Sequence, residues 1–135
     1  MDLSDEQFLA AFLECRIPAA AFDHRGHVRV AWLLLKRRPL DQAIEEICSG
    51  IARLAAHLGA PDKYNRTLSE ALVRLMARQM MLGGPAMTWE EFLAANTWLM
   101  NDVPGVLARH YSPERLHSSA AKAGFVVPDR LPLPL

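Results

Sequence analysis

Residues 22–37 read FDHRGHVRVAWLLLKR, and this stretch decides the fold class. Its apolar residues cover most of the circumference of a helix, which is typical of a helix buried on nearly all sides. Asp23 is a favourable N-cap residue, and the basic residues 36–38 suit the C-terminal end of a helix because the helix dipole is negative there. The sequence therefore predicts a central, mostly buried helix over residues 23–36.

Amphipathic helices are predicted on both sides of this central helix. Three capping boxes mark helix starts, each with Ser or Thr followed three residues later by Gln or Glu; they begin at Ser4, Thr67 and Thr88. Proline and glycine mark the ends of these helices. The predicted helices cover residues 4–15, 41–59, 67–82, a segment from Thr88 with apolar residues as far as Met100, 103–109 and 113–123.

No segment alternates between apolar and polar residues with the turn signals of a strand, so no sheet is expected. Residues 124–135 alternate proline with leucine, and we expect them to be extended, with Leu131 and Leu133 packed on the helices. A chain of 135 residues suits one domain. The expected fold is all-α: an irregular single-domain bundle, residues 1–135, of about six to seven helices with an extended Pro/Leu tail.

Composition excludes several function classes. Fifteen basic and fifteen acidic residues give no net charge, so neither nucleic acid nor an anionic membrane is an expected partner. The longest apolar run, VAWLLL, is too short to span a bilayer. Cys15 and Cys48 lie apart in apolar segments, and the start MDLSDEQ is acidic, unlike a signal peptide. We expect a cytoplasmic protein with two reduced thiols.

His24 and His27 are the candidate catalytic residues. Their spacing of three places both on one face of the first turn of the predicted central helix. Free backbone N–H groups and the helix dipole favour anions at this end. Imidazole also moves protons near neutral pH and binds metal ions. Two interpretations stay open here: a functional pair, or a solvated helix start.

The segment KYNRTLSE, residues 63–70, places polar side chains at a second predicted helix start. If this start faces the His24 and His27 turn, Tyr64, Asn65 and Arg66 enclose a small polar pocket over an apolar floor. In the alternative, Thr67 caps the helix, Tyr64 packs, and the other two side chains are solvated.

Three stretches together resemble a widespread family of small bacterial proteins that has no assigned activity. They are FDHRGHVRVAWLLL at 22–35, KYNRTLSEALVRL at 63–75 and HYSPERLHSSAAKAGFVVPDRLPLP at 110–134. The family pattern is a His-x-x-His helix start followed later by a Tyr-His-Glu-Thr segment. The resemblance covers most of the chain, and it implies that His24, His27, Tyr64 and Thr67 occupy the motif positions.

The chain departs from the family pattern at Asn65 and Arg66, which stand where the family has His-Glu. If typical members bind a metal through three histidines and a carboxylate, two ligands are missing here. Arg66 instead adds a cation that can hold a carboxylate or phosphate of a substrate. The resemblance therefore implies a diverged, metal-free member that keeps the histidine pair.

The leading hypothesis is a small-molecule enzyme with an interhelical pocket and no cofactor, which performs an isomerisation, cyclisation or elimination. His24 and His27 act as general acid and base. The expected substrate-binding residues are Tyr64 and Asn65 on a carbonyl group, Arg66 on an anionic group, and Trp32 in the apolar wall. For Trp32, ordinary core packing is the alternative.

Two other hypotheses stay open. In one, His24 and His27 bind Zn or Fe together with a carboxylate, with Glu14 as the candidate. In the other, the protein is a non-catalytic helical interaction or accessory protein, and a homodimer is possible. The apolar composition and the Pro/Leu tail support this third hypothesis. The metal content of purified protein separates the first two.

Overall fold

The computed structural model describes residues 3–134, and its regular structure is entirely helical, which confirms the all-α class. In this part of the chain the elements are α1 (Asp5–Leu13), η1 (Ala19–Ala21), α2 (His24–Arg37), α3 (Leu40–His57), η2 (Pro61–Lys63), α4 (Arg66–Gly83), α5 (Trp89–Ala95), α6 (Trp98–Asn101), α7 (Val103–Ala108), α8 (Pro113–Leu116) and α9 (Ser119–Ala123). No helix among these residues is long and apolar enough to cross a membrane. The chain divides into two compact units, of which the first ends at Tyr64 and the second begins at Asn65. The prediction of a single domain stays a prediction.

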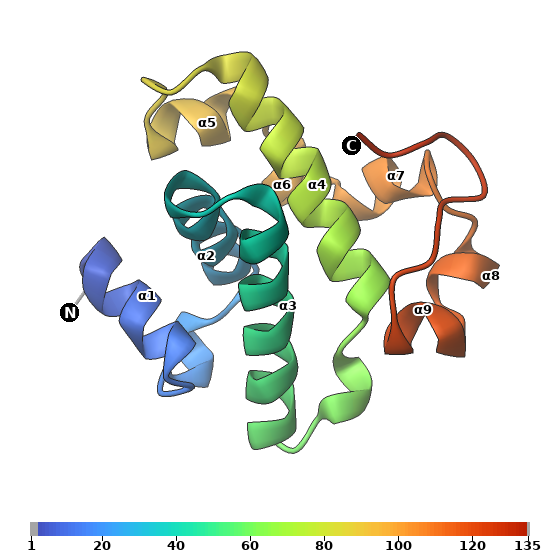
Figure 1. Ribbon diagram of the computed structural model, residues 1–135, viewed down its shortest axis with the longest axis horizontal. Coiled ribbons are helices and arrows are strands. Elements are labelled where there is room, and N and C mark those ends of the chain that lie inside the picture. The colour runs from blue at the N-terminus through green and yellow to red at the C-terminus, as the bar shows by residue number, and fades with distance from the viewer. Residues whose placement is uncertain (1–2, 135) are drawn as a thin grey trace. The chain divides into compact units, whose positions relative to one another are not determined.

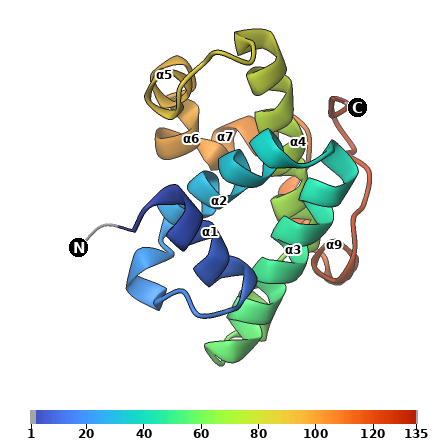
Figure 2. The ribbon, with the colours of Figure 1, turned by 60° about the vertical axis from the view of Figure 1, so that its left-hand side comes forward.

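The first unit is built around α2, which contacts both α1 and α3 (Figures 1 and 2). The predicted central helix is confirmed: Asp23 caps it, and its side chain accepts a hydrogen bond from the Gly26 N–H at 2.9 Å. Residues Val28, Val30, Ala31, Trp32, Leu33 and Leu34 of α2 are buried. On α3, Gly50 faces the Phe12 ring of α1 so closely that a methyl group at position 50 would overlap it. The absence of a side chain at Gly50 therefore lets α1 approach α3.

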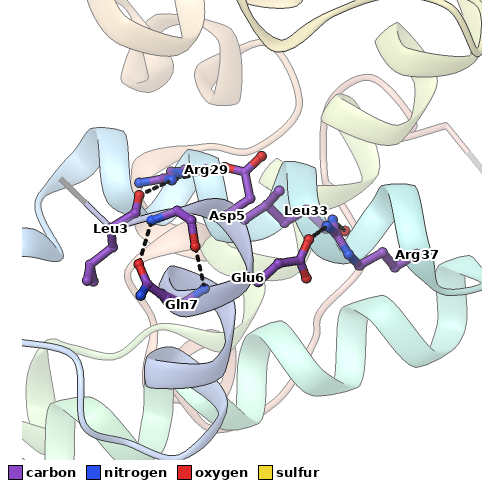
Figure 3. Close-up of polar contacts among 8 residues, drawn as sticks. Leu3, Asp5, Glu6, Gln7, Arg29, Leu33 and Arg37 are labelled. Carbon is purple, nitrogen blue, oxygen red and sulfur yellow. Dashed lines mark hydrogen bonds and ion pairs between the residues drawn. The ribbon is translucent and has the colours of Figure 1, made fainter.

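Charged side chains join α1 to α2 at the rim of this unit (Figure 3). Arg29 Nη2 lies 2.9 Å from Asp5 Oδ1 and also donates to the Leu3 carbonyl at 3.0 Å, and Arg37 pairs with Glu6 at 3.0 Å. Each exposed pair contributes only about 0–1 kcal/mol, so these contacts add little to the stability of the unit. The predicted capping box at Ser4 is confirmed.

The second unit is built on α4, which α7 and α9 contact. Its core contains Ala71, Leu107, Tyr111 and Leu116, with Leu133 of the tail packed against them. Beyond Gly124 the described tail has no helix, as predicted, and Figure 1 shows it in red running past α9 and α8. The expected packing of Leu133 is confirmed, whereas that of Leu131 is wrong, because Leu131 is 58 % exposed.

Three details of the helix predictions are wrong. The capping box at Thr67 is absent: Asn65 caps α4, and the Thr67 hydroxyl instead donates to the Gly124 carbonyl at 2.9 Å and accepts from the Val126 N–H at 3.0 Å. The helix predicted from Thr88 breaks at Asn96, whose side chain donates to the Phe92 carbonyl. The last predicted helix is divided into α8 and α9, and Ser118 caps the second of these.

Candidate functional site

A cleft of about 350 Å³ opens in the first unit beside the start of α2. This volume lies at the lower end of the range for small-molecule sites, about 300–1,000 Å³. The lining residues come from the start of α2, the end of α3 and the η2 segment: Phe22, His27, Ile51, Leu54, Ala55, Leu58, Ala60, Lys63 and Tyr64. Apart from His27, Lys63 and Tyr64, these side chains are apolar, so the cleft offers polar groups at only a few points.

Local backbone geometry explains how His27 reaches the cleft. The His27 N–H donates to the Asp23 carbonyl at 3.0 Å, which closes the first turn of α2. Gly26 is buried in this turn, and a Cβ there would lie 2.7 Å from the Ala21 carbonyl oxygen. A side chain at position 26 would push the turn away from the preceding chain. Glycine therefore keeps His27 close to the wall of the cleft.

The other polar side of the cleft is set by the turn after α3. Gly59 adopts φ +77°, a left-handed conformation that favours glycine, directly after the helix ends. The chain then forms the short η2 turn, Pro61–Lys63, which contacts α3. This turn brings Lys63 and Tyr64 to the same cleft as His27. The sequence analysis predicted Tyr64 as a site residue, but not Lys63.

The His27 imidazole is half-buried and lies on the Phe22 ring, with the ring centroids 4.1 Å apart and an interplanar angle of 31°. Burial lowers the pKa of His27 from 6.5 to about 4; the neighbouring His24 adds to this effect, and Asp23 opposes it. The ring is therefore neutral at pH 7. A neutral imidazole has one ring nitrogen with a lone pair, which can accept a proton.

His24 and Trp32 are not among the described residues that line the cleft. His24 is the first residue of α2 and is exposed, and it acts on the site through its charge, which lowers the pKa of His27. Trp32 is only 6 % exposed, and Lys36 Nζ lies 5.2 Å from the centre of its ring. This position agrees with the core-packing alternative for Trp32.

Asn65 and Arg66 belong to the second unit, and each has partners there. Asn65 Oδ1 accepts from the Leu68 N–H at 3.0 Å, and its Nδ2 donates to the Leu116 carbonyl at 2.8 Å. Arg66 donates from Nε and Nη2 to Glu70 Oε1 at 3.0 and 2.8 Å. These bonds give both side chains a structural role, and their roles toward a substrate stay predictions.

No three His, Cys, Asp or Glu side chains within residues 3–134 are grouped so that they could hold a metal ion. His24, His27 and Glu14 therefore do not form such a group. Glu14 is exposed and pairs with Arg16 at 3.0 Å, and its hydrogen bond with Arg16 lowers its pKa. The geometry does not support a metal held by these three side chains together.

The apolar wall from α3 was not predicted as part of a site. The sequence shows one apolar stripe along α3, and none of its residues was predicted as a site residue. At the end of the helix this stripe passes from the core to the cleft: Leu54 is 3 % exposed, and Leu58 is 51 % exposed. The only signal for this change is that Leu58 directly precedes the helix-ending Gly59.

Comparisons of the chain with family models, curated proteins and solved structures found no match. The resemblance of its histidine and tyrosine motifs to a bacterial family therefore stays a prediction. The functional argument rests on the geometry of the cleft.

Proposed function

We propose that the protein binds a small, mostly apolar carbonyl compound in the His27 cleft and transfers a proton on it without a cofactor. The observation that carries this proposal is the neutral, half-buried imidazole in a mainly apolar cleft. Ile51, Leu54 and Leu58 would hold the carbon skeleton, since apolar walls favour burial of apolar surface. Isomerisation, cyclisation and elimination all need such a proton transfer.

His27 would act as the general base. A base with a pKa of about 4 is weak, so the proton it removes must be acidified by the site. The Tyr64 hydroxyl and the Lys63 ammonium group, which line the same cleft, would stabilise negative charge on the carbonyl oxygen. Asp23 would favour the imidazolium ion once it forms, because its charge raises the pKa of His27. His24, exposed on the same turn, would exchange the proton with solvent.

The test is proton exchange of small aryl and cyclic ketones in D₂O, followed by ¹H NMR. The protein should exchange the α-protons of at least one ketone faster than an equal concentration of free imidazole does. His27→Gln should lose this activity, whereas His57→Gln, which alters an exposed histidine on α3, should retain it. Equal rates in the His27→Gln and His57→Gln variants would contradict the proposal, provided that far-UV circular dichroism shows both to be folded.

Two further measurements address the other hypotheses. Elemental analysis of protein purified without added metal or chelator tests the Zn or Fe alternative. Near-stoichiometric metal that is lost in the His24→Ala, His27→Ala double variant would replace proton transfer by metal chemistry. A mass that rises with protein concentration, without any proton exchange, would favour an accessory protein that forms a dimer.

A further inference from the structure

A second cleft, of about 370 Å³, lies in the second unit between α4 and the tail. The residues that line it are Arg74 of α4 and seven tail residues: Phe125, Val127, Pro128, Arg130, Pro132, Leu133 and Pro134. The proposal for this cleft is independent of the function proposed for the His27 cleft.

The charged side chains among the described lining residues of this cleft are positive. Two guanidinium groups line it, and no carboxylate side chain is among its described lining residues. Asp129, the acidic residue of the tail, is occupied elsewhere: its two oxygens accept from the N–H and the hydroxyl of Ser112 at 2.8 and 2.6 Å. The Asp129 carboxylate therefore binds Ser112 and not the guanidinium group of Arg130.

Arg74 is held in place with an excess of positive charge around it. Its Nε and Nη2 lie 3.0 and 2.9 Å from Glu70 Oε2, while Arg66 occupies the other oxygen of the same carboxylate. One carboxylate, only 6 % exposed, thus serves two guanidinium groups. The guanidinium carbon of Arg74 also lies 5.6 Å from the centre of the Phe125 ring. These contacts pre-organise Arg74 as an anion-binding group.

Apolar and donor-poor side chains form the rest of the cleft. Phe125, Val127 and Leu133 offer apolar surface, and the three prolines have no N–H group to donate. The cleft therefore offers strong donors only at its two arginines. A matching ligand has one negatively charged group and an apolar body.

Hydrogen bonds to the backbone hold the tail in position as a wall of the cleft. The Tyr111 hydroxyl donates to the Val126 carbonyl at 2.6 Å, and the N–H groups of Arg130 and Leu131 donate to the carbonyls of His110 and Arg109 at 2.9 and 3.2 Å. Arg130 Nη1 also donates to the Ala108 carbonyl at 2.7 Å. Because the wall is already ordered, binding costs little conformational entropy.

We propose that this cleft binds a small monocarboxylic acid with an apolar or aromatic body. The carboxylate lies between Arg74 and Arg130, and the apolar body lies against Phe125 and the prolines. The Nη1 group of Arg130 is bound to the Ala108 carbonyl, so Arg130 offers its Nε and Nη2 groups as a pair to a carboxylate. Arg74, whose Nε and Nη2 groups bind Glu70, offers its Nη1 group.

The probes are 4-phenylbutyrate and its uncharged amide, each titrated into the full chain and followed by ¹⁵N–¹H NMR. The acid should shift resonances of the tail residues, and the amide should bind at least about tenfold more weakly, since it loses charge-assisted bonds. Arg130→Gln should weaken binding of the acid by a similar factor. Arg78→Gln, which changes an exposed arginine one turn along α4, should bind like the wild type.

Three outcomes would overturn the proposal. They are equal binding of the acid and the amide, unchanged binding by Arg130→Gln, and no binding of the acid at millimolar concentration. Inorganic phosphate is the third probe: if it shifts the same resonances at the same concentration as the acid, the cleft is an unselective anion site and the apolar body has no role. Arg130→Gln removes the Nη1 bond to the Ala108 carbonyl but leaves the backbone hydrogen bonds of the tail, so its spectrum should show a folded protein.

Discussion

Replacing His27 by glutamine should remove a large part of the pH dependence of the free energy of unfolding. In the folded protein the pKa of His27 is about 4, against 6.5 in the unfolded chain. Between these values the unfolded state binds one more proton, so stability rises with pH across this window. This difference in pKa corresponds to about 3 kcal/mol in the free energy of unfolding. That stability is fully present above pH 6.5 and is lost as the pH falls to 4.

Urea unfolding followed by far-UV circular dichroism at several pH values from 4 to 7 measures this dependence. As the pH falls from 7 to 4, the free energy of unfolding of His27→Gln should decrease by about 3 kcal/mol less than that of the wild type. His117→Gln, which changes an exposed histidine of the second unit, is the control. NMR titration of the His27 ring protons gives the pKa directly. The reasoning is refuted if that pKa is near 6.5, or if wild type and His27→Gln show parallel pH dependences.

The same titration in His24→Gln separates the causes. Loss of the charge of His24 should raise the pKa of His27, because that charge lowers it. The pKa should still stay below 6.5, because burial is the largest cause and is unchanged. A pKa that does not move would show that the two imidazoles do not interact.

Three further substitutions test the packing, each by thermal or urea unfolding. Gly50→Ala should destabilise the protein by about 1–3 kcal/mol, because the added methyl group overlaps the Phe12 ring. The control is Gly124→Ala, which should change the stability little because no atom lies within 4 Å of the added methyl group. Asn65→Ala should cost about 1–3 kcal/mol, because it removes the cap of α4 and leaves a buried carbonyl without its donor. Asn65→Asp should keep the cap but place a carboxylate oxygen, which cannot donate, against the Leu116 carbonyl. Glu70→Gln should cost about 2–4 kcal/mol, because it removes the negative charge shared by two partly buried arginines, and an unchanged midpoint would show that solvent screens this cluster.

Local signals in the sequence were sufficient for the helices whose ends depend on neighbouring residues. Asp23 caps α2 as its type and position indicate, and the capping boxes at Ser4 and Thr88 form as predicted. Thr67 fits the same pattern equally well, but its hydroxyl bonds to Gly124 and Val126 far along the chain. A pattern of four residues does not contain such partners, so the cap of α4, which is Asn65, was misplaced by two residues.

The candidate site was predictable only in part. His27 and Tyr64 carry polar chemistry beside helix starts, which is a signal that a sequence contains. The sequence could not distinguish His24 from His27 as the site residue, since both fit the motif. Only the direction of the first turn of α2 makes one ring exposed and the other half-buried. The α3 wall depends on which part of an apolar stripe stays uncovered, and the second cleft depends on where the tail packs beside Arg74. Both are settled by tertiary packing.

The attachment of the tail suggests how its specificity could change during evolution. Much of the attachment of the tail uses its main chain: the N–H groups of Val126, Arg130 and Leu131 donate hydrogen bonds. Positions 128, 132 and 134 are prolines, which have no N–H group to donate. Side chains that face the cleft, such as Phe125, can therefore be exchanged while the path of the chain is kept. Proline at 126, 130 or 131 would remove one of these N–H donors, so selection should act against it. Cleft-facing positions such as Phe125 can vary, so relatives of this protein can differ in the ligands that they bind.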